Sequence, residues 1–220
     1  MGKLIVIEGL DGSGKSTQLD LLCKNLEKTG KKFKEVSFPD YSSDSSALVK
    51  MYLGGKFGSH PSDVNPYTSS LFFAVDRFAS YKTGWGKFYS EGGIVVSGRY
   101  TTSNAIHQTC KMPENEWKNF VDWLYDLEYK KVGIPAPNLV IFLDMPVEVS
   151  QKLLTSRYGG DEGHKDIHES AVQYLNHCRR AARFVAEYSG FKIISCAEGG
   201  APRTIEDIGN DVLKAALEVI

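Results

Sequence analysis

The segment that most constrains this chain is a glycine-rich loop near its beginning, with the sequence GLDGSGKST over residues 9–17. It follows the apolar run LIVI of residues 4–7 and precedes a segment whose apolar residues have helical spacing. A strand, a loop of the form G-x-x-x-x-G-K-[ST] and a helix, in this order, are typical of a phosphate-binding loop. The sequence therefore predicts an α/β fold of the P-loop NTPase type.

The residue types in this loop match the chemistry of a nucleoside triphosphate. Its glycines let the backbone wrap tightly, so that N–H groups and the start of the next helix form a socket for phosphate. Lys15 can reach the β- and γ-phosphates, and the Ser16 hydroxyl can bind Mg²⁺. The residues expected to contact the phosphates of ATP are Gly9, Asp11, Gly12, Ser13, Gly14, Lys15, Ser16 and Thr17.

Beyond the loop, short apolar segments alternate with longer stretches of helical spacing. This alternation favours βαβ units and a parallel sheet. We predict one domain over residues 1–220, with a five-stranded parallel sheet flanked by helices on both faces. The expected strands cover residues 4–8, 33–38, 93–97, 138–143 and 191–195.

Three further segments carry local signals. Asn65 followed by proline predicts the start of a helix, and Thr204 with Asp207 resembles a capping box at the start of the last helix. A long helix is expected over residues 166–188. The glycine-rich, charged residues of about 156–166 are either a plain surface loop or a short mobile lid that closes over the phosphates. In the second case Arg157 would supply the positive charge of the lid.

Composition narrows the class of protein. Lys and Arg number 26 and Asp and Glu 27, so a net charge of −1 gives no reason to expect a nucleic-acid or membrane partner. The four cysteines are far apart and form no C-x-x-C pair, which is typical of reduced thiols in the cytoplasm. No apolar run approaches the length that spans a membrane. We therefore expect a soluble cytoplasmic enzyme.

Five ordered segments resemble the motifs of the thymidylate kinases. They are residues 7–17 (IEGLDGSGKST), 38–41 (FPDY), 71–77 (LFFAVDR), 98–105 (GRYTTSNA), and the pair Asp166 and Glu169. The resemblance covers nearly the whole length. It implies that Mg²⁺ and ATP are used to convert dTMP to dTDP, in dTTP synthesis. It also implies a homodimer, for which the apolar segments 66–81 and 120–127 would supply an interface.

For the base, the resemblance implies that Phe73 stacks on thymine and that Arg77 hydrogen-bonds its carbonyl edge. Four residues apart, the two side chains share one helix face, which suits a flat ligand with polar edges. Ser103 and Asn104 would help to read the base. The competing interpretation of Phe73 is an ordinary core residue of an aromatic-rich helix.

For the phosphate and sugar, the resemblance implies that Arg99 grips the acceptor phosphate, with Phe38 and Tyr41 nearby. Asp11 would accept a hydrogen bond from the 3′-hydroxyl. His107 stands where the family often has an aromatic residue that crowds a ribose 2′-hydroxyl. A surface histidine without a ligand role is the alternative.

The chemistry expected of such a site needs little acid–base help. A monophosphate is already an anionic nucleophile, so the site must supply positioning and positive charge. We expect Lys15, Arg99 and Arg157 to supply that charge as the catalytic residues. The arginines of the long helix are instead expected to be solvated surface residues: Arg179, Arg180 and Arg183.

One position departs from the family pattern. Gly98 stands where the family has an aspartate near the metal, which leaves Glu8 and Asp11 as nearby carboxylates. Two other functions therefore stay open. One is a kinase for another nucleoside monophosphate or for a deoxynucleoside, although the latter needs a carboxylate base that Gly98 does not provide. The other is a nucleotide-binding sensor with degraded catalysis, which Gly98 and the arginine-poor lid would favour.

Overall fold

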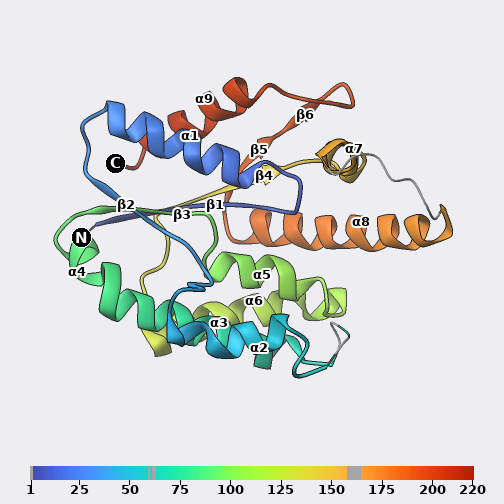
Figure 1. Cartoon of the computed structure of the whole chain (residues 1–220), viewed down its shortest axis with the longest axis horizontal. Coiled ribbons are helices and arrows are strands. Elements are labelled where there is room, and N and C mark those ends of the chain that lie inside the picture. Colours follow the sequence, from blue (N-terminus) through green and yellow to red (C-terminus); the bar gives the residue numbers. More distant parts are fainter. Residues whose placement is uncertain (1, 59, 61–62, 158–164) are drawn as a thin grey trace.

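The computed structural model describes residues 2–58, 60, 63–157 and 165–220. Its centre is a five-stranded, fully parallel sheet in the order β2-β3-β1-β4-β5 (Figure 1). This confirms the predicted five-stranded parallel sheet. The strands are β1 Lys3–Gly9, β2 Phe33–Val36, β3 Ile94–Ser97, β4 Leu139–Asp144 and β5 Lys192–Ser195.

Strand β1 lies in the middle of the sheet and is covered on both sides. Leu4, Ile5, Val6 and Ile7 are all fully buried, as expected for a central parallel strand. Ile5 and Ile7 pack into one hydrophobic cluster, whereas Leu4 and Val6 belong to another. The continuous apolar run before the glycine loop is therefore explained by burial on two faces.

Helices cover both faces of the sheet, as predicted (Figure 1). Helices α1 (Lys15–Lys28) and α9 (Ile205–Leu217) lie together on one face. On the other face, α5 (Thr101–Thr109) packs against α8 (Lys165–Tyr188), with α3 and α6 beside it. The remaining α-helices of the described residues are α2 Ala47–Leu53, α3 Pro66–Ser80, α4 Gly86–Ser90, α6 Trp117–Tyr125 and α7 Val147–Arg157.

The two predicted helix starts are confirmed. The Asn65 side chain accepts a hydrogen bond from the Thr68 N–H at 2.9 Å, and Pro66 is the first residue of α3. Thr204 Oγ1 accepts from the Asp207 N–H at 3.1 Å at the start of α9. The described residues also form two π-helical turns, η2 (Tyr81–Trp85) and η4 (Asp126–Val132). Two 3₁₀ turns are present as well, η1 (Asp44–Ser46) and η3 (Glu114–Glu116).

Two features differ from the prediction. Strand β2 ends at Val36, two residues early, because its only neighbour β3 ends at the paired Ser97. A small antiparallel pair, β6 (Ala197–Glu198) and β7 (Ala201–Pro202), was not predicted. Its turn is Gly199-Gly200 with φ of 57° and 79°, a conformation that favours glycine and suits a tight hairpin.

The expected long helix over 166–188 is α8, which begins one residue earlier. Of the expected lid at about 156–166, residues 158–164 lie outside the described residues. In the described part of the chain, every helix is too short or too polar to cross a membrane.

Candidate active site

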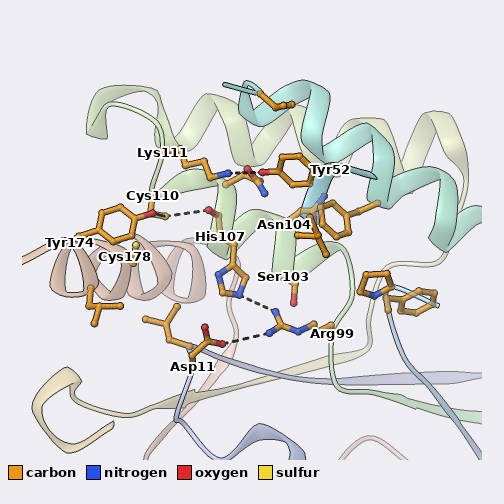
Figure 2. A pocket seen from close by; sticks show the side chains of 18 of the residues that line it. Asp11, Tyr52, Arg99, Ser103, Asn104, His107, Cys110, Lys111, Tyr174 and Cys178 are labelled. Atoms are coloured by element: carbon orange, nitrogen blue, oxygen red, sulfur yellow. Dashed lines mark hydrogen bonds and ion pairs between the residues drawn. The ribbon is translucent and has the colours of Figure 1, made fainter. Parts of the chain in front are cut away.

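A cavity of about 640 Å³ opens beside the glycine-rich loop, at the carboxyl ends of the parallel strands (Figure 2). This is where open α/β sheets bind ligands. Its walls come from the loop and from helices α2, α3, α5, α7 and α8. All nine residues that were predicted to bind the acceptor nucleotide line it: Asp11, Phe38, Tyr41, Phe73, Arg77, Arg99, Ser103, Asn104 and His107.

The glycine-rich loop connects β1 to α1 and curls around the side chain of Lys15. Gly12 and Gly14 have φ of 76° and 84°, which only glycine adopts without strain. The Lys15 ammonium donates to the carbonyl oxygens of Gly9 at 2.7 Å and Leu10 at 3.0 Å. Burial, followed by the charge of Arg99, lowers the pKa of Lys15. The loop therefore holds a partly desolvated cation at its centre.

Two hydroxyls of this loop stand out. Ser13 Oγ is buried and has no hydrogen-bond partner among the described residues, so it is a free polar group inside the phosphate socket. Ser16 lies exposed in the first turn of α1, where its hydroxyl is open to a ligand. Within the described ranges, no three His, Cys, Asp or Glu side chains gather into a metal-binding group. A hydroxyl together with phosphate oxygens and water fits Mg²⁺, which commonly keeps several waters.

Arg99 is held between two partners at the entrance to the cavity (Figure 2). Its Nη2 lies 3.7 Å from Asp11 Oδ1, and its Nη1 lies 3.1 Å from His107 Nε2. Burial, then the charges of Arg99 and Lys15, lowers the pKa of His107 to about 4. The ring is therefore neutral near pH 7, and Nε2 accepts from the guanidinium, which has only donors. His107 thus positions Arg99, a contact that the sequence did not suggest.

Glu8, at the end of β1, is fully buried behind the cavity wall. Its carboxylate accepts from Thr102 Oγ1 at 2.7 Å and from Ser103 Oγ at 2.8 and 2.9 Å. Burial raises the pKa of Glu8, against the lowering effect of these hydroxyls and of the nearby cations. Ser103, which was expected to help read the base, lines the cavity and donates its hydroxyl to Glu8.

The position of the missing family aspartate is tightly packed. A Cβ at Gly98 would lie 2.8 Å from Leu19 Cδ2, the mobile end of a core side chain. Glu8 and Asp11 are the two carboxylates that the sequence offers near this position. The Glu8 carboxylate already accepts hydrogen bonds from Thr102 and Ser103. Asp11 is 80% exposed and lies beside Arg99.

Arg77 enters the cavity wall from α3 as half of a buried ion pair. Its Nε and Nη2 donate to the two oxygens of Glu128 at 2.7 and 2.5 Å. Thr101 Oγ1 donates to the same carboxylate at 2.8 Å, and Arg77 Nη1 lies 3.4 Å from the Tyr100 carbonyl oxygen. Burial alone would lower the pKa of Arg77, but Glu128 outweighs it and the pKa is raised. Arg77 therefore stays charged, and Nη1 is its least engaged nitrogen.

Two more predicted residues form the wall between α3 and α5. The Phe73 ring lies edge-on to Tyr52, with ring centres 6.2 Å apart. The Asn104 amide donates to the Ser70 carbonyl at 3.3 Å, which joins the two helices. Phe73 is half-buried in the wall of the cavity, so it is not the ordinary core residue of the alternative interpretation.

Several lining residues were missed by sequence reasoning. Lys111 Nζ donates to the Tyr52 hydroxyl at 2.9 Å across the far end of the cavity, and Tyr174 enters from α8 (Figure 2). Tyr52 and Tyr174 belong to no recognised motif, and only the folded chain brings both of them to the cavity. Lys111 lies two residues beyond the end of α5, where no motif marked it.

The expectation of a solvated arginine face is wrong for Arg179. This side chain pairs in bidentate fashion with the buried Asp144 at 2.8 and 3.0 Å, because a carboxylate at the end of a buried strand needs a partner. Arg180 is exposed, whereas the half-exposed Arg183 also approaches Asp144, at 3.4 Å. The Arg157 side chain, and the side chains of the motif pair Asp166 and Glu169, lie outside the described residues.

A phosphate-binding loop at the end of the central strand of a parallel sheet, beside a cavity with a buried cation, defines a nucleotide-binding protein of the P-loop NTPase type. Comparison with known proteins narrows this class. The family model described as thymidylate kinase matches residues 7–199. The chain belongs to the thymidylate kinase family.

Individual relatives agree. The chain is 30% identical to a probable thymidylate kinase of Thermococcus gammatolerans, over 97% of this chain and 95% of the relative. It is 29% identical to the thymidylate kinase of Homo sapiens, over 96% of this chain and 88% of that one. A solved structure of thymidylate kinase from Candida albicans has a TM-score of 0.70 at 22% identity. It covers 99% of this chain and 92% of that chain, and it shows the same fold.

Proposed function

We propose that this chain transfers the γ-phosphate of ATP to dTMP, giving ADP and dTDP for dTTP synthesis. The observation that carries the proposal is the gathering of nine acceptor-site residues, from four separate segments of sequence, around one cavity beside the phosphate-binding loop. Membership of the thymidylate kinase family supports the identity of the acceptor. Residues 1–220 act as one domain, which the single sheet running from β1 to β5 supports.

At the phosphate end, positive charge and positioning do the chemical work. Lys15 and the backbone of residues 9–17 bind the β- and γ-phosphates of ATP, and Arg99 grips the acceptor phosphate. Because Arg99 is already held by His107 and Asp11, little side-chain freedom is lost when the acceptor binds. The two cations then stabilise the charge that spreads over the transferred group. Arg157, at the end of α7, adds a third cation.

At the base end, the cavity wall offers an aromatic ring and fixed polar groups. Phe73 stacks on thymine, Arg77 Nη1 donates to a carbonyl of the base, and the Asn104 amide reads the same edge. Glu128 supports this arrangement because its bidentate contact fixes the plane of the Arg77 guanidinium. Phe38 and Tyr41 belong with Arg99 to the part of the cavity that takes the acceptor phosphate. Asp11 accepts a hydrogen bond from the 3′-hydroxyl of the acceptor sugar.

Ser16 would hold Mg²⁺ together with the phosphates of ATP. When bound, the ion would neutralise phosphate charge and orient the leaving group. No carboxylate is available at Gly98, so this chain's own contribution to holding the ion rests on Ser16, with Asp11 nearby. The fit of one hydroxyl to a largely hydrated Mg²⁺ supports this assignment.

The protein acts as a homodimer in the cytoplasm, without nucleic-acid or membrane partners. An apolar stripe on α3, formed by Tyr67, Leu71, Val75 and Phe78, supports the dimer: these side chains are 37%, 44%, 53% and 38% exposed, at helical spacing. The four cysteines, all free thiols, support a reducing compartment.

The test is ADP release from Mg-ATP with dTMP, dUMP, dCMP, AMP or no acceptor. We expect turnover that is selective for dTMP. We also expect Lys15→Met to lower kcat by about 10²–10³, as for other single groups that stabilise transition-state charge. The matched control is Lys24→Met, an exposed lysine on the same helix α1.

Each contrary outcome points to one of the alternatives. Turnover with another monophosphate in preference to dTMP would identify a different nucleotide kinase. Tight dTMP binding without turnover would identify a sensor that has lost catalysis. Equal losses in Lys15→Met and Lys24→Met would show that Lys15 has no role in the transfer.

A further inference from the structure

Two of the four cysteines lie side by side in the wall of the nucleotide cavity (Figure 2). Cys110 directly follows α5, and Cys178 lies in the middle of α8, 68 residues later in the chain. Cys110 Sγ lies 3.9 Å from the hydroxyl of Tyr174, which precedes Cys178 by one helical turn on α8. Neither thiol takes part in the proposed phosphoryl transfer.

The two thiols have unequal acidity. The neighbouring Cys110 thiol, helped by Tyr174 and Lys111, lowers the pKa of Cys178 to about 7 against the opposing effect of burial. The same pairing raises the pKa of Cys110. Near neutral pH one member of the pair is therefore substantially a thiolate, the reactive form, and the other keeps its proton.

The other two cysteines provide an internal comparison. Cys23 and Cys196 are buried in the hydrophobic cluster on the α1 and α9 face of the sheet, away from the cavity. Burial raises the pKa of both, to about 12. They are expected to be inert toward oxidants, as is usual for thiols in an apolar core.

We propose that Cys110 and Cys178 form a site of reversible oxidation, at which a hydroperoxide that enters the cavity joins them in a disulfide, and that bound acceptor nucleotide blocks the reaction. Only the claim that bound nucleotide blocks the oxidation rests on the proposed function. A hydroperoxide is small enough to enter a cavity that is shaped for a nucleotide. The two thiols lie side by side in the cavity wall, where α5 packs against α8 (Figure 2), so the pair needs little movement to close the bond.

The reaction proceeds in two steps. The Cys178 thiolate attacks one oxygen of hydrogen peroxide, the O–O bond breaks, and the departing hydroxide takes a proton from the solvent to form water, which leaves a sulfenic acid on Cys178. Cys110 then attacks that sulfur, the sulfenic hydroxyl leaves as a second water with the Cys110 proton, and the S–S bond forms. The two sulfurs lose two electrons in total, and the peroxide gains them.

The disulfide is expected to weaken binding of the acceptor. Cys110 Sγ lies 3.2 Å from the carbonyl oxygen of His107, the residue that positions Arg99. A covalent bond to α8 removes this contact from the last turn of α5. Conversely, a nucleotide in the cavity covers both thiols, because they line the same wall.

The experiment treats the full chain with hydrogen peroxide and follows intact mass and a non-reducing peptide map. We expect loss of two hydrogen atoms, one cross-linked peptide pair containing residues 110 and 178, and full reversal by dithiothreitol. Cys110→Ser should give no cross-link but should leave a sulfenic acid on Cys178, which dimedone traps. Cys23→Ser is the matched control and should cross-link at the wild-type rate.

Repeating the oxidation with saturating dTMP tests the protection by nucleotide separately from the formation of the disulfide. Slower cross-linking in the presence of dTMP, and a higher KM for dTMP in the oxidised protein, are expected. Oxidation of Cys23 or Cys196 as fast as Cys178, or absence of the 110–178 cross-link, would overturn the proposal. If dTMP binds but does not slow the cross-linking, the claim that bound nucleotide blocks the oxidation is wrong. If dTMP does not bind at all, the proposed function fails while the cross-link still tests the site.

Discussion

His107 supports Arg99 only while its imidazole is neutral. Its pKa is about 4 in the folded protein and about 6.5 in an unfolded chain. Between these two values the unfolded state binds more protons, so the stability contributed at this residue rises with pH and levels off above about 6.5. Acid therefore lowers the stability of the folded chain already between about pH 6.5 and 4, where the His107 ring of the folded protein is still neutral.

We expect His107→Gln to remove this acid sensitivity. On going from about pH 7.5 to about pH 5, the wild type should lose about 2 kcal/mol more unfolding free energy than the variant. Urea unfolding at the two pH values measures the difference. His60→Gln, at an exposed position, should follow the wild type. An unchanged pH dependence in His107→Gln would show that another group is responsible.

Arg77 depends on Glu128 for its charge balance, because both side chains are almost completely buried. Glu128→Gln leaves the guanidinium without an anionic partner and should cost about 3 kcal/mol of unfolding free energy. KM for dTMP should also rise, while kcat changes less. Glu116→Gln, an exposed glutamate in η3, is the control. A loss of less than about 0.5 kcal/mol, the range usual for surface substitutions, would contradict the importance of the pair.

At the scale of elements, helix α3 determines where Phe73 and Arg77 lie in the cavity wall, and its start is fixed by Asn65. Replacing this cap by alanine should lower the unfolding free energy by about 1 kcal/mol. Chemical denaturation measures it, with the exposed Asn119→Ala on α6 as the control. Equal effects of the two substitutions would show that the Asn65 side chain contributes nothing as a cap.

The elements also show what was predictable. Asn65 and Thr204 act through near neighbours, and each of the five strand segments is marked by its own apolar run, so these elements could be predicted from the sequence. The nine cavity residues were named from motifs, and the fold brings them together. The partner of Arg77 lies 51 residues away, and Cys178 lies beside Cys110 in the cavity wall only after α5 and α8 pack. Such pairs depend on tertiary packing, which no local pattern encodes.

At the scale of the whole molecule, the apolar stripe on α3 makes a prediction about assembly. If it forms the dimer interface, Val75→Lys should place a charge there and give a monomer in sedimentation velocity, whereas the wild type sediments as a dimer. Ile205→Lys on α9 is a closely matched control, because Ile205 and Val75 are both 53% exposed. A monomeric wild type, or a dimer that tolerates Val75→Lys, would exclude this face as the interface.

The central position of β1 has a consequence for biosynthesis. Lys3 pairs with Ile94 of β3, and Ile5 pairs with Leu139 of β4, so the first strand to emerge from the ribosome waits for partners that are made much later. Its apolar residues stay unpaired during most of translation, and pairings so distant in sequence form slowly. We therefore expect nascent chains that end before residue 139 to depend on chaperones, because the phosphate-binding loop gains its final support only when β4 joins the sheet.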